Sequence, residues 1–186
     1  MISKDNLPDL LTLLGFHKKA AVWTKTIDGA ILQVDFTKEQ IHYPEAQGLT
    51  INERTTCNFS SNENFVVLEC VHRLLEKGYK PEHMELEPKW KVGHGASGGR
   101  ADVLIKDNDG KALLIIECKT PGREFDRAWR NTRVDGDQLF SYAQQISETQ
   151  FLCLYTSDLN GGALTYTSHV IAHRDNDKYL ADNPTF

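Results

Sequence analysis

No stretch of the sequence reaches the roughly 20 apolar residues that a membrane-spanning helix needs. The amino-terminal residues include Lys4, Asp5 and Asp9 where a secretory signal would be apolar. The 4 cysteines are scattered, with no C-x-x-C pair and no Cys/His quartet, which argues against structural zinc and a disulfide framework. We therefore expect a cytoplasmic protein without a membrane partner, whose thiols stay reduced and buried.

The sequence also lacks an excess of basic residues. Its formal net charge is −5 over 186 residues, so the chain has no overall positive field with which to hold nucleic acid. Binding to DNA would need a local basic patch, together with a metal ion that offsets nearby carboxylates. The length is sufficient for one large domain, or for one domain with an appended element.

Residues 1–58 are expected to form an N-terminal attachment that contains a helix and a β-hairpin. Asp28-Gly29 separates two runs of alternating apolar residues, and Asp-Gly between such runs is a strong hairpin signal. The predicted helix, the two strands and the irregular connector after them cover residues 4–16, 21–27, 30–36 and 37–60.

Residues 59–175 are expected to form the core domain, and residues 176–186 a polar tail or a linker to a further region. A helix begins near Ser61 or Asn62, either of which can cap it, and ends at Gly78. The later predicted elements are strands over residues 84–92, 101–105, 112–119 and 150–157, a helix over 136–147, and a last hairpin that turns at 160–162. This order predicts an α/β (α+β) fold with a mixed central sheet flanked by helices.

Three charged residues converge at one end of a predicted hairpin. Asp102 opens one strand, while Glu117 and Lys119 end its partner after the apolar run LLII. Side chains alternate across a strand, so Glu117 and Lys119 share a face and Cys118 points away. Pairing about the turn at 108–110 sets residue 102 opposite residue 117. Two carboxylates and an ammonium group should therefore meet there.

Such a group of side chains suits phosphodiester chemistry. Carboxylates from adjacent strands favour a hard cation such as Mg²⁺, which lowers the pKa of a bound water and stabilises charge on phosphoryl oxygens. A nearby lysine can hold the attacking water or the phosphate. The simpler alternative is a solvated Glu–Lys ion pair at a strand end. A charged triplet that ends a core-type strand favours the functional interpretation.

The segment GRADVLIKDNDGKALLIIECKTPG resembles the PD-(D/E)XK nuclease motif in the N-terminal domain of type I restriction enzyme R subunits. It is also similar to the matching domain of fused restriction-methyltransferase polypeptides. The similarity covers roughly residues 60–157, and it includes LEKGY before the D-x₁₄-E-x-K core and Q-x-x-x-Y after it. Ala101 stands where the motif usually has proline, a frequent variation that leaves the aspartate in place.

The resemblance implies a restriction-endonuclease-like core and a Mg²⁺-dependent endonuclease that hydrolyses DNA phosphodiester bonds, with Mn²⁺ as a substitute metal. Asp102, Glu117 and the backbone carbonyl of Cys118 are the implied metal ligands. Lys119 is expected to orient water or phosphate.

Two helices are expected to complete this site. Gln138 and Tyr142 are four residues apart, so they share a helix face, and the resemblance implies that they position DNA or the lysine. A third acid is expected from the helix that begins near residue 62. On a helical wheel, Glu63 falls on the inward face and Glu69 on the solvent side. We therefore expect Glu63 to be a metal ligand and Glu69 to be exposed.

A local cluster of basic residues gives the acidic chain a candidate phosphate track. The expected DNA-binding residues are Arg100, Arg123, Arg127, Arg130 and Arg133. The last four form one stripe if their segment is helical and a basic cluster if it is a loop. A solvated charged face is the alternative interpretation.

The expected partners are double-stranded DNA and the helicase, methyltransferase or specificity regions of the same polypeptide or complex. A rival interpretation is a nucleic-acid-binding or docking module that keeps a nuclease-like fold without turnover. A more distant rival is a serine hydrolase that uses Ser97 in a G-x-S-x-G match. A strand is predicted after Ser97, whereas a nucleophile elbow needs a helix there.

Overall fold

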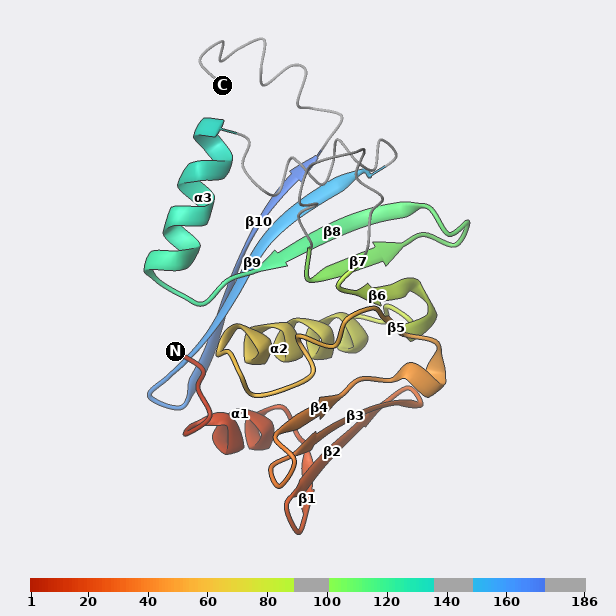
Figure 1. The fold of residues 1–186 in the computed structure, drawn as a ribbon, viewed down its shortest axis with the longest axis vertical. Helices are drawn as coiled ribbons and strands as arrows, with labels where there is room; N and C mark the ends of the chain where they lie inside the picture. Colours follow the sequence, from red (N-terminus) through yellow and green to blue (C-terminus); the bar gives the residue numbers. More distant parts are fainter. Residues whose placement is uncertain (89–100, 136–148, 173–186) are drawn as a thin grey trace.

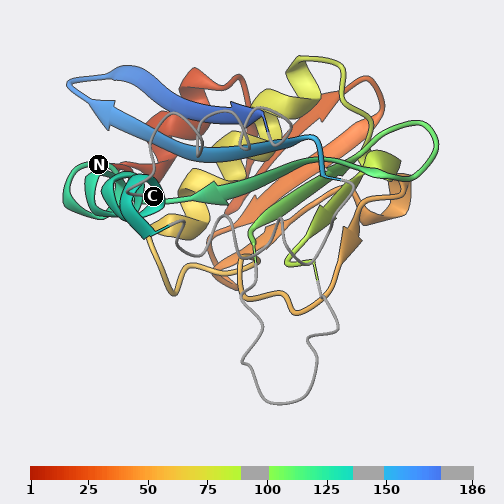
Figure 2. The ribbon, with the colours of Figure 1, turned by 90° about the horizontal axis from the view of Figure 1, so that it is seen from above.

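Helix α2 (Glu63–Glu76) is the middle layer of the molecule (Figure 1). The computed structural model describes residues 1–88, 101–135 and 149–172. A four-stranded sheet with strand order β1-β2-β3-β4 lies on one side of α2, together with helix α1 (Leu7–Leu13). A six-stranded sheet with order β10-β9-β8-β7-β6-β5 lies on the other side, and Figure 2 shows the same layers from above.

The N-terminal helix and hairpin are confirmed. The hairpin strands are β2 (Val22–Ile27) and β3 (Ala30–Asp35), and Asp28 and Gly29 between them have φ angles of 47° and 86°. Two successive positive φ angles are those of a type I′ turn, whose twist matches that of paired strands. The helix is shorter than the predicted range 4–16. The flanking strands are β1 (His17–Lys19) and β4 (Gln40–His42).

The prediction of an irregular connector over residues 37–60 is wrong in part. This segment contains β4, the 3₁₀ turn η1 (Glu45–Gln47) and strand β5 (Thr50–Ile51). Strand β5 pairs in parallel with β6 (Met84–Leu86), so the N-terminal segment adds an edge strand to the larger sheet. Strands of two or three residues are too short to show alternation, which is why the sequence pattern does not reveal them.

The six-stranded sheet is mixed, as predicted. Its other strands are β7 (Val103–Lys106), β8 (Ala112–Cys118), β9 (Phe151–Asn160) and β10 (Ala163–Ala172). The pairs β6–β7, β7–β8 and β9–β10 are antiparallel, whereas β8 and β9 run parallel. Strand β8 is central and apolar on both faces, which is typical of a strand covered by helices.

The predicted strand over 84–92 is described only as far as β6, because residues 89–100 lie outside the described part of the chain. The predicted helix over 136–147 also lies outside it. The arginine-containing segment is helical and forms α3 (Arg123–Asp135), which packs on β9. A second, smaller core joins them through Phe125, Leu152 and Leu154.

Helix α2 is buried around almost its whole circumference, because both sheets pack on it. Every residue from Asn64 to His72 is buried, and the side chain of Glu69 is 0% exposed. The expectation that Glu69 faces solvent is therefore wrong. The wheel assumed one buried face, as on a surface helix, whereas a helix between two layers has no solvent face along its middle turns.

Among the helices of residues 1–88, 101–135 and 149–172, none is long and apolar enough to cross a membrane.

Candidate nuclease site

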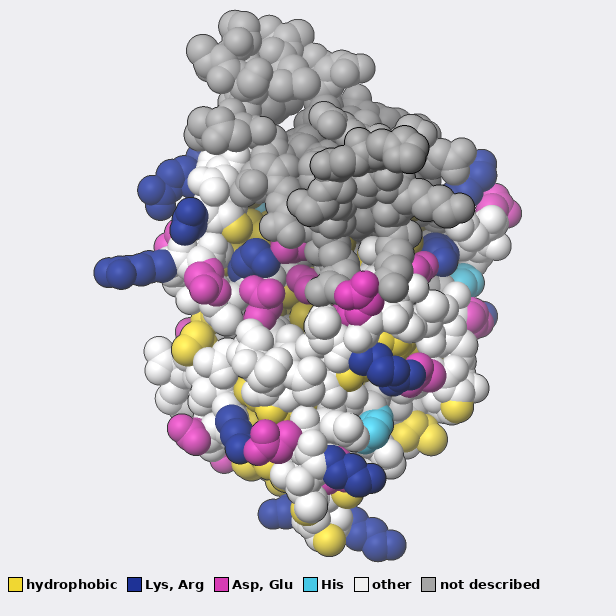
Figure 3. Space-filling model, in the orientation of Figure 1, with side chains coloured by type: hydrophobic (Ala, Val, Ile, Leu, Met, Phe, Trp, Pro, Cys, Tyr) yellow, Lys and Arg dark blue, Asp and Glu magenta, His cyan; other side chains and the backbone are white. Residues whose placement is uncertain are grey.

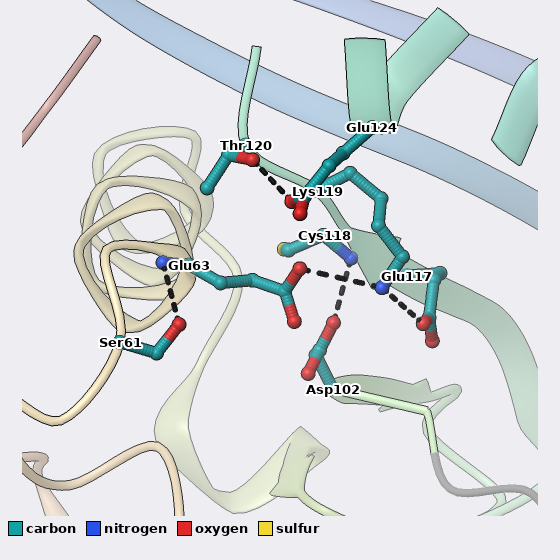
Figure 4. Close-up of polar contacts among 8 residues, drawn as sticks. All are labelled: Ser61, Glu63, Asp102, Glu117, Cys118, Lys119, Thr120 and Glu124. Atoms are coloured by element: carbon teal, nitrogen blue, oxygen red, sulfur yellow. Dashed lines mark hydrogen bonds and ion pairs between the residues drawn. The ribbon is translucent and has the colours of Figure 1, made fainter. Parts of the chain in front are cut away.

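Asp102 and Glu117 lie at the same end of the β7–β8 hairpin. Val103 pairs with Ile116, so the residues one step further, 102 and 117, are opposite each other, as predicted. The Cys118 amide donates a hydrogen bond of 2.7 Å to Oδ2 of Asp102 (Figure 4). The amide and carbonyl of a strand residue face the same neighbouring strand. We therefore expect the Cys118 carbonyl on the Asp102 side of β8.

Lys119 lies between two carboxylates (Figure 4). Its Nζ is 2.7 Å from Oε1 of Glu117 and 3.4 Å from Oε2 of Glu63. Its backbone amide donates to the Tyr155 carbonyl at 2.9 Å, which extends the β8–β9 pairing past the end of β8. Lys119 is thus held at two points: its main-chain amide is bonded to β9, and its side-chain ammonium contacts two carboxylates.

Glu63 comes to the site from the first turn of α2. Its amide donates to Oγ of Ser61 at 3.2 Å, whereas Asn62 makes no side-chain cap hydrogen bond, so Ser61 is the capping residue. The carboxylate of Glu63 points toward Lys119 and Asp102 (Figure 4). The structure therefore places Glu63 in the cluster and Glu69 outside it. Its role as a metal ligand remains a prediction.

The electrostatics of the site reflect crowded acids. Burial and the negative charge of Glu117 raise the pKa of Asp102, against the opposing effects of the Cys118 amide and Lys119. Burial alone would lower the pKa of Lys119, but the carboxylates of Glu117 and Glu63 raise it above its ordinary value. Lys119 is therefore charged at neutral pH, and a second positive charge beside Asp102 would favour its carboxylate form.

The donor set fits a hard cation in its chemistry. Asp102, Glu117 and Glu63 offer carboxylate oxygens, the ligand type that Mg²⁺ prefers. Within the described ranges, however, no three His, Cys, Asp or Glu side chains are arranged as a ready metal site. The Lys119 ammonium compensates Glu117 and Glu63 in this arrangement. A cation held by the same acids would take over part of that compensation.

Helix α3 presents arginines to solvent. Arg123, Arg127, Arg130 and Arg133 are all exposed, on the face of the helix opposite to the buried Phe125 and Thr132. Asp126 lies on the same exposed face and reduces its net charge. In Figure 3, basic side chains project from the side where α3 lies, next to a group of acidic side chains. The segment is thus the stripe, and not the loop, of the two arrangements that its spacing allowed.

Several predicted residues lie outside the described ranges. These are Arg100, Gln138 and Tyr142, together with Ser97 of the G-x-S-x-G match.

The sequence did not indicate a buried network behind the site. Oε1 and Oε2 of Glu69 are each 2.5 Å from a partner, the Arg73 guanidinium and the Tyr155 hydroxyl respectively. Arg73 also donates to that hydroxyl at 2.9 Å. The Tyr155 carbonyl accepts from the Lys119 amide, so the network is linked to the site through the main chain of Tyr155. The i, i+4 spacing of Glu69 and Arg73 on one helix was the available signal.

A comparison with curated proteins finds no match to this chain. The family model for the type I restriction enzyme R protein N terminus matches residues 62–165, more than half of the chain. The matched range begins just before α2 and includes the site acids, Lys119 and α3. The chain therefore belongs to the family of type I restriction enzyme R protein N termini.

Proposed function

We propose that this domain is a Mg²⁺-dependent DNA endonuclease module of a restriction-modification system, with Mn²⁺ as a substitute metal. The observation that carries the proposal is the position of Lys119 between Glu117 and Glu63, beside an Asp102 carboxylate anchored on the Cys118 amide. Family membership supports a nuclease-related role. A plain surface ion pair would not need a third acid from a separate helix.

Asp102 and Glu117, with the Cys118 carbonyl and Glu63, are the proposed metal ligands. When bound there, Mg²⁺ would supply a water of lowered pKa and stabilise charge on the phosphate. The rigid strand ends hold the carboxylates at fixed positions, since main-chain pairing sets both of them. Preorganised groups of this kind need little rearrangement during the reaction.

Lys119 has the proposed role of orienting the attacking water or the scissile phosphate. Its side chain is 21% exposed, so the ammonium is held in place yet can be reached from solvent. A metal held by the acids would take over part of their charge compensation, so that the Lys119 ammonium could contact a phosphate oxygen. Gln138 and Tyr142 are proposed to support this step on the basis of the resemblance alone.

Double-stranded DNA is the proposed substrate, and the arginines of α3 are its proposed phosphate contacts. Further proposed partners are the helicase, methyltransferase or specificity regions of the restriction system. The net charge of −5 makes weak DNA binding by this domain alone the expected behaviour. Cleavage should therefore be measured in the assembled restriction enzyme.

The metal site can be tested with Asp102→Asn, which keeps the side-chain size and an oxygen that can accept from the Cys118 amide. Mn²⁺ binding, followed by electron paramagnetic resonance, should be lost because a charged ligand is removed. The matched control is Asp109→Asn, an exposed residue in the turn at the other end of the same hairpin. Wild-type Mn²⁺ affinity in Asp102→Asn would contradict the proposed ligand set.

A further inference from the structure

Glu87 lies opposite Asp102 at the end of the β6–β7 pair, on the side of β7 that faces away from β8. It directly follows β6, and its amide donates a hydrogen bond of 2.9 Å to the Asp102 carbonyl. Leu86 pairs with Val103, so this bond extends the β6–β7 ladder by one residue. Asp102 is therefore held from both neighbouring strands: its carbonyl by Glu87 and its carboxylate by Cys118.

The side chain of Glu87 fastens the N-terminal connector to this position. Its Oε1 accepts from the Thr56 amide at 2.6 Å and from the Thr56 hydroxyl at 2.7 Å. Burial alone would raise the pKa of Glu87, but the hydrogen bonds from Thr56 and Thr55 lower it, so the group is a carboxylate at neutral pH. One residue thus joins the connector, β6 and the first acid of the site.

The backbone of Glu87 is unfavourable for stability. Its φ angle is +53°, in the left-handed region, which is strained for a residue with a Cβ. The residue is only 1% exposed, so its carboxylate depends on hydrogen bonds from the protein in place of water. A glycine or an asparagine would adopt this backbone conformation more easily. Unfavourable features of this kind concentrate at functional sites.

We propose that Glu87 is a positioning residue, which fixes the main chain of Asp102 by clamping Thr56 while its amide holds the Asp102 carbonyl. The left-handed backbone turns the Glu87 side chain toward Thr56. The clamp keeps the Asp102 carboxylate on the Cys118 amide and ready to bind metal. This inference rests on the proposed function only for its metal-binding readout.

The test uses Glu87→Gln, which removes the charge that strengthens both hydrogen bonds from Thr56, and Thr56→Val, which removes one of the two bonds. Thr56→Ser is the conservative variant that retains the hydroxyl. Glu85→Gln is the matched control, because Glu85 is a glutamate of β6 two residues before Glu87. This substitution likewise removes one negative charge, and it breaks the ion pair of Glu85 with Lys106 at 2.7 Å. Loss of a partner that orients a metal ligand typically weakens metal affinity by about 10- to 100-fold. Glu87→Gln and Thr56→Val should weaken Mn²⁺ binding in that range, whereas Thr56→Ser and Glu85→Gln should not.

A second readout uses the protein without metal. Hydrogen exchange of the Cys118 amide, which donates to Asp102, should accelerate in Glu87→Gln and Thr56→Val relative to the Ile116 amide further along β8. It should stay at the wild-type rate in Glu85→Gln. Unchanged Cys118 exchange in both clamp variants would overturn the positioning role. Absence of Mn²⁺ binding in the wild-type protein would overturn the metal site instead, and the exchange result would still decide the role of Glu87.

Discussion

The ammonium of Lys119 and the carboxylate of Glu117 lie 2.7 Å apart, on residues that share one face of the central sheet at the end of β8. Cys118 between them is buried on the opposite face, and its amide holds Asp102. The last two residues of β8, Glu117 and Cys118, together with Lys119 directly after them, therefore set the positions of both hairpin acids and the lysine. The arrangement depends on strand alternation and pairing, which a loop would not provide.

The buried Glu69 network should contribute strongly to stability. Glu69→Ala leaves the Arg73 guanidinium, which is stacked 3.7 Å from the Tyr166 ring, without its carboxylate. Breaking a buried ion pair by removing one partner costs about 3–5 kcal/mol, and Arg73 is partly exposed, so we expect a loss near the lower value. Urea denaturation would measure it.

Glu76→Ala is the matched control on the same helix. Glu76 is 46% exposed and 3.2 Å from Lys25, and an exposed pair of this kind contributes about 1 kcal/mol or less. Equal losses in the free energy of unfolding for the two variants would show that the buried Glu69 network does not contribute more to stability than an exposed ion pair.

The acidic residues of this protein show what the sequence could and could not predict. The site acids Asp102 and Glu117 follow from a hairpin turn and a two-residue period, which are local rules. The burial of Glu69 depends on a second layer that packs across α2, and no local pattern records that. Glu87 was missed for a similar reason, because its left-handed backbone and its contact with Thr56, 31 residues earlier, arise from tertiary packing.

The stability of the protein should depend on pH through His72. Burial lowers its pKa, an effect that Lys25 and Arg73 increase and Glu76 opposes. The unfolded chain therefore takes up a proton more readily than the folded protein. The resulting stability is present above the ordinary histidine pKa of 6.5 and is lost as the pH falls through the lower folded value. Urea denaturation at pH 7.5 and pH 5 would measure this loss.

His72→Gln should lose less stability than the wild-type protein between those two pH values, because glutamine does not titrate. His42→Gln, at an exposed position of β4, serves as the control and should follow the wild-type dependence. If all three proteins lose the same amount, acid unfolding is governed by other groups.

The arginine stripe of α3 should contribute to DNA binding through charge. In the assembled enzyme, the double variant Arg127→Gln/Arg130→Gln should bind double-stranded DNA more weakly, with little dependence on sequence. The slope of log affinity against log salt should decrease by about one for each phosphate that the variant no longer neutralises. Fluorescence anisotropy at several salt concentrations measures both quantities.

The control for the stripe is Lys18→Gln/Lys19→Gln. These exposed residues lie on β1, at the opposite end of the molecule from α3 (Figure 1), and their replacement changes the net charge equally. A matching reduction in slope for both double variants would indicate a nonspecific charge effect, not a track on α3.

DNA cleavage by the assembled restriction enzyme with Lys119→Ala tests the nuclease assignment most directly. Lys106→Ala is the matched control, because Lys106 lies on β7 of the same sheet and is likewise 2.7 Å from a glutamate, Glu85. Loss of one preorganised group that stabilises the reacting charge typically slows an enzyme by about 10²- to 10³-fold. We predict a loss of at least that size for Lys119→Ala, with cleavage by Lys106→Ala close to the wild-type rate. Cleavage by Lys119→Ala at the rate of the control would contradict the assignment and favour a docking module without turnover.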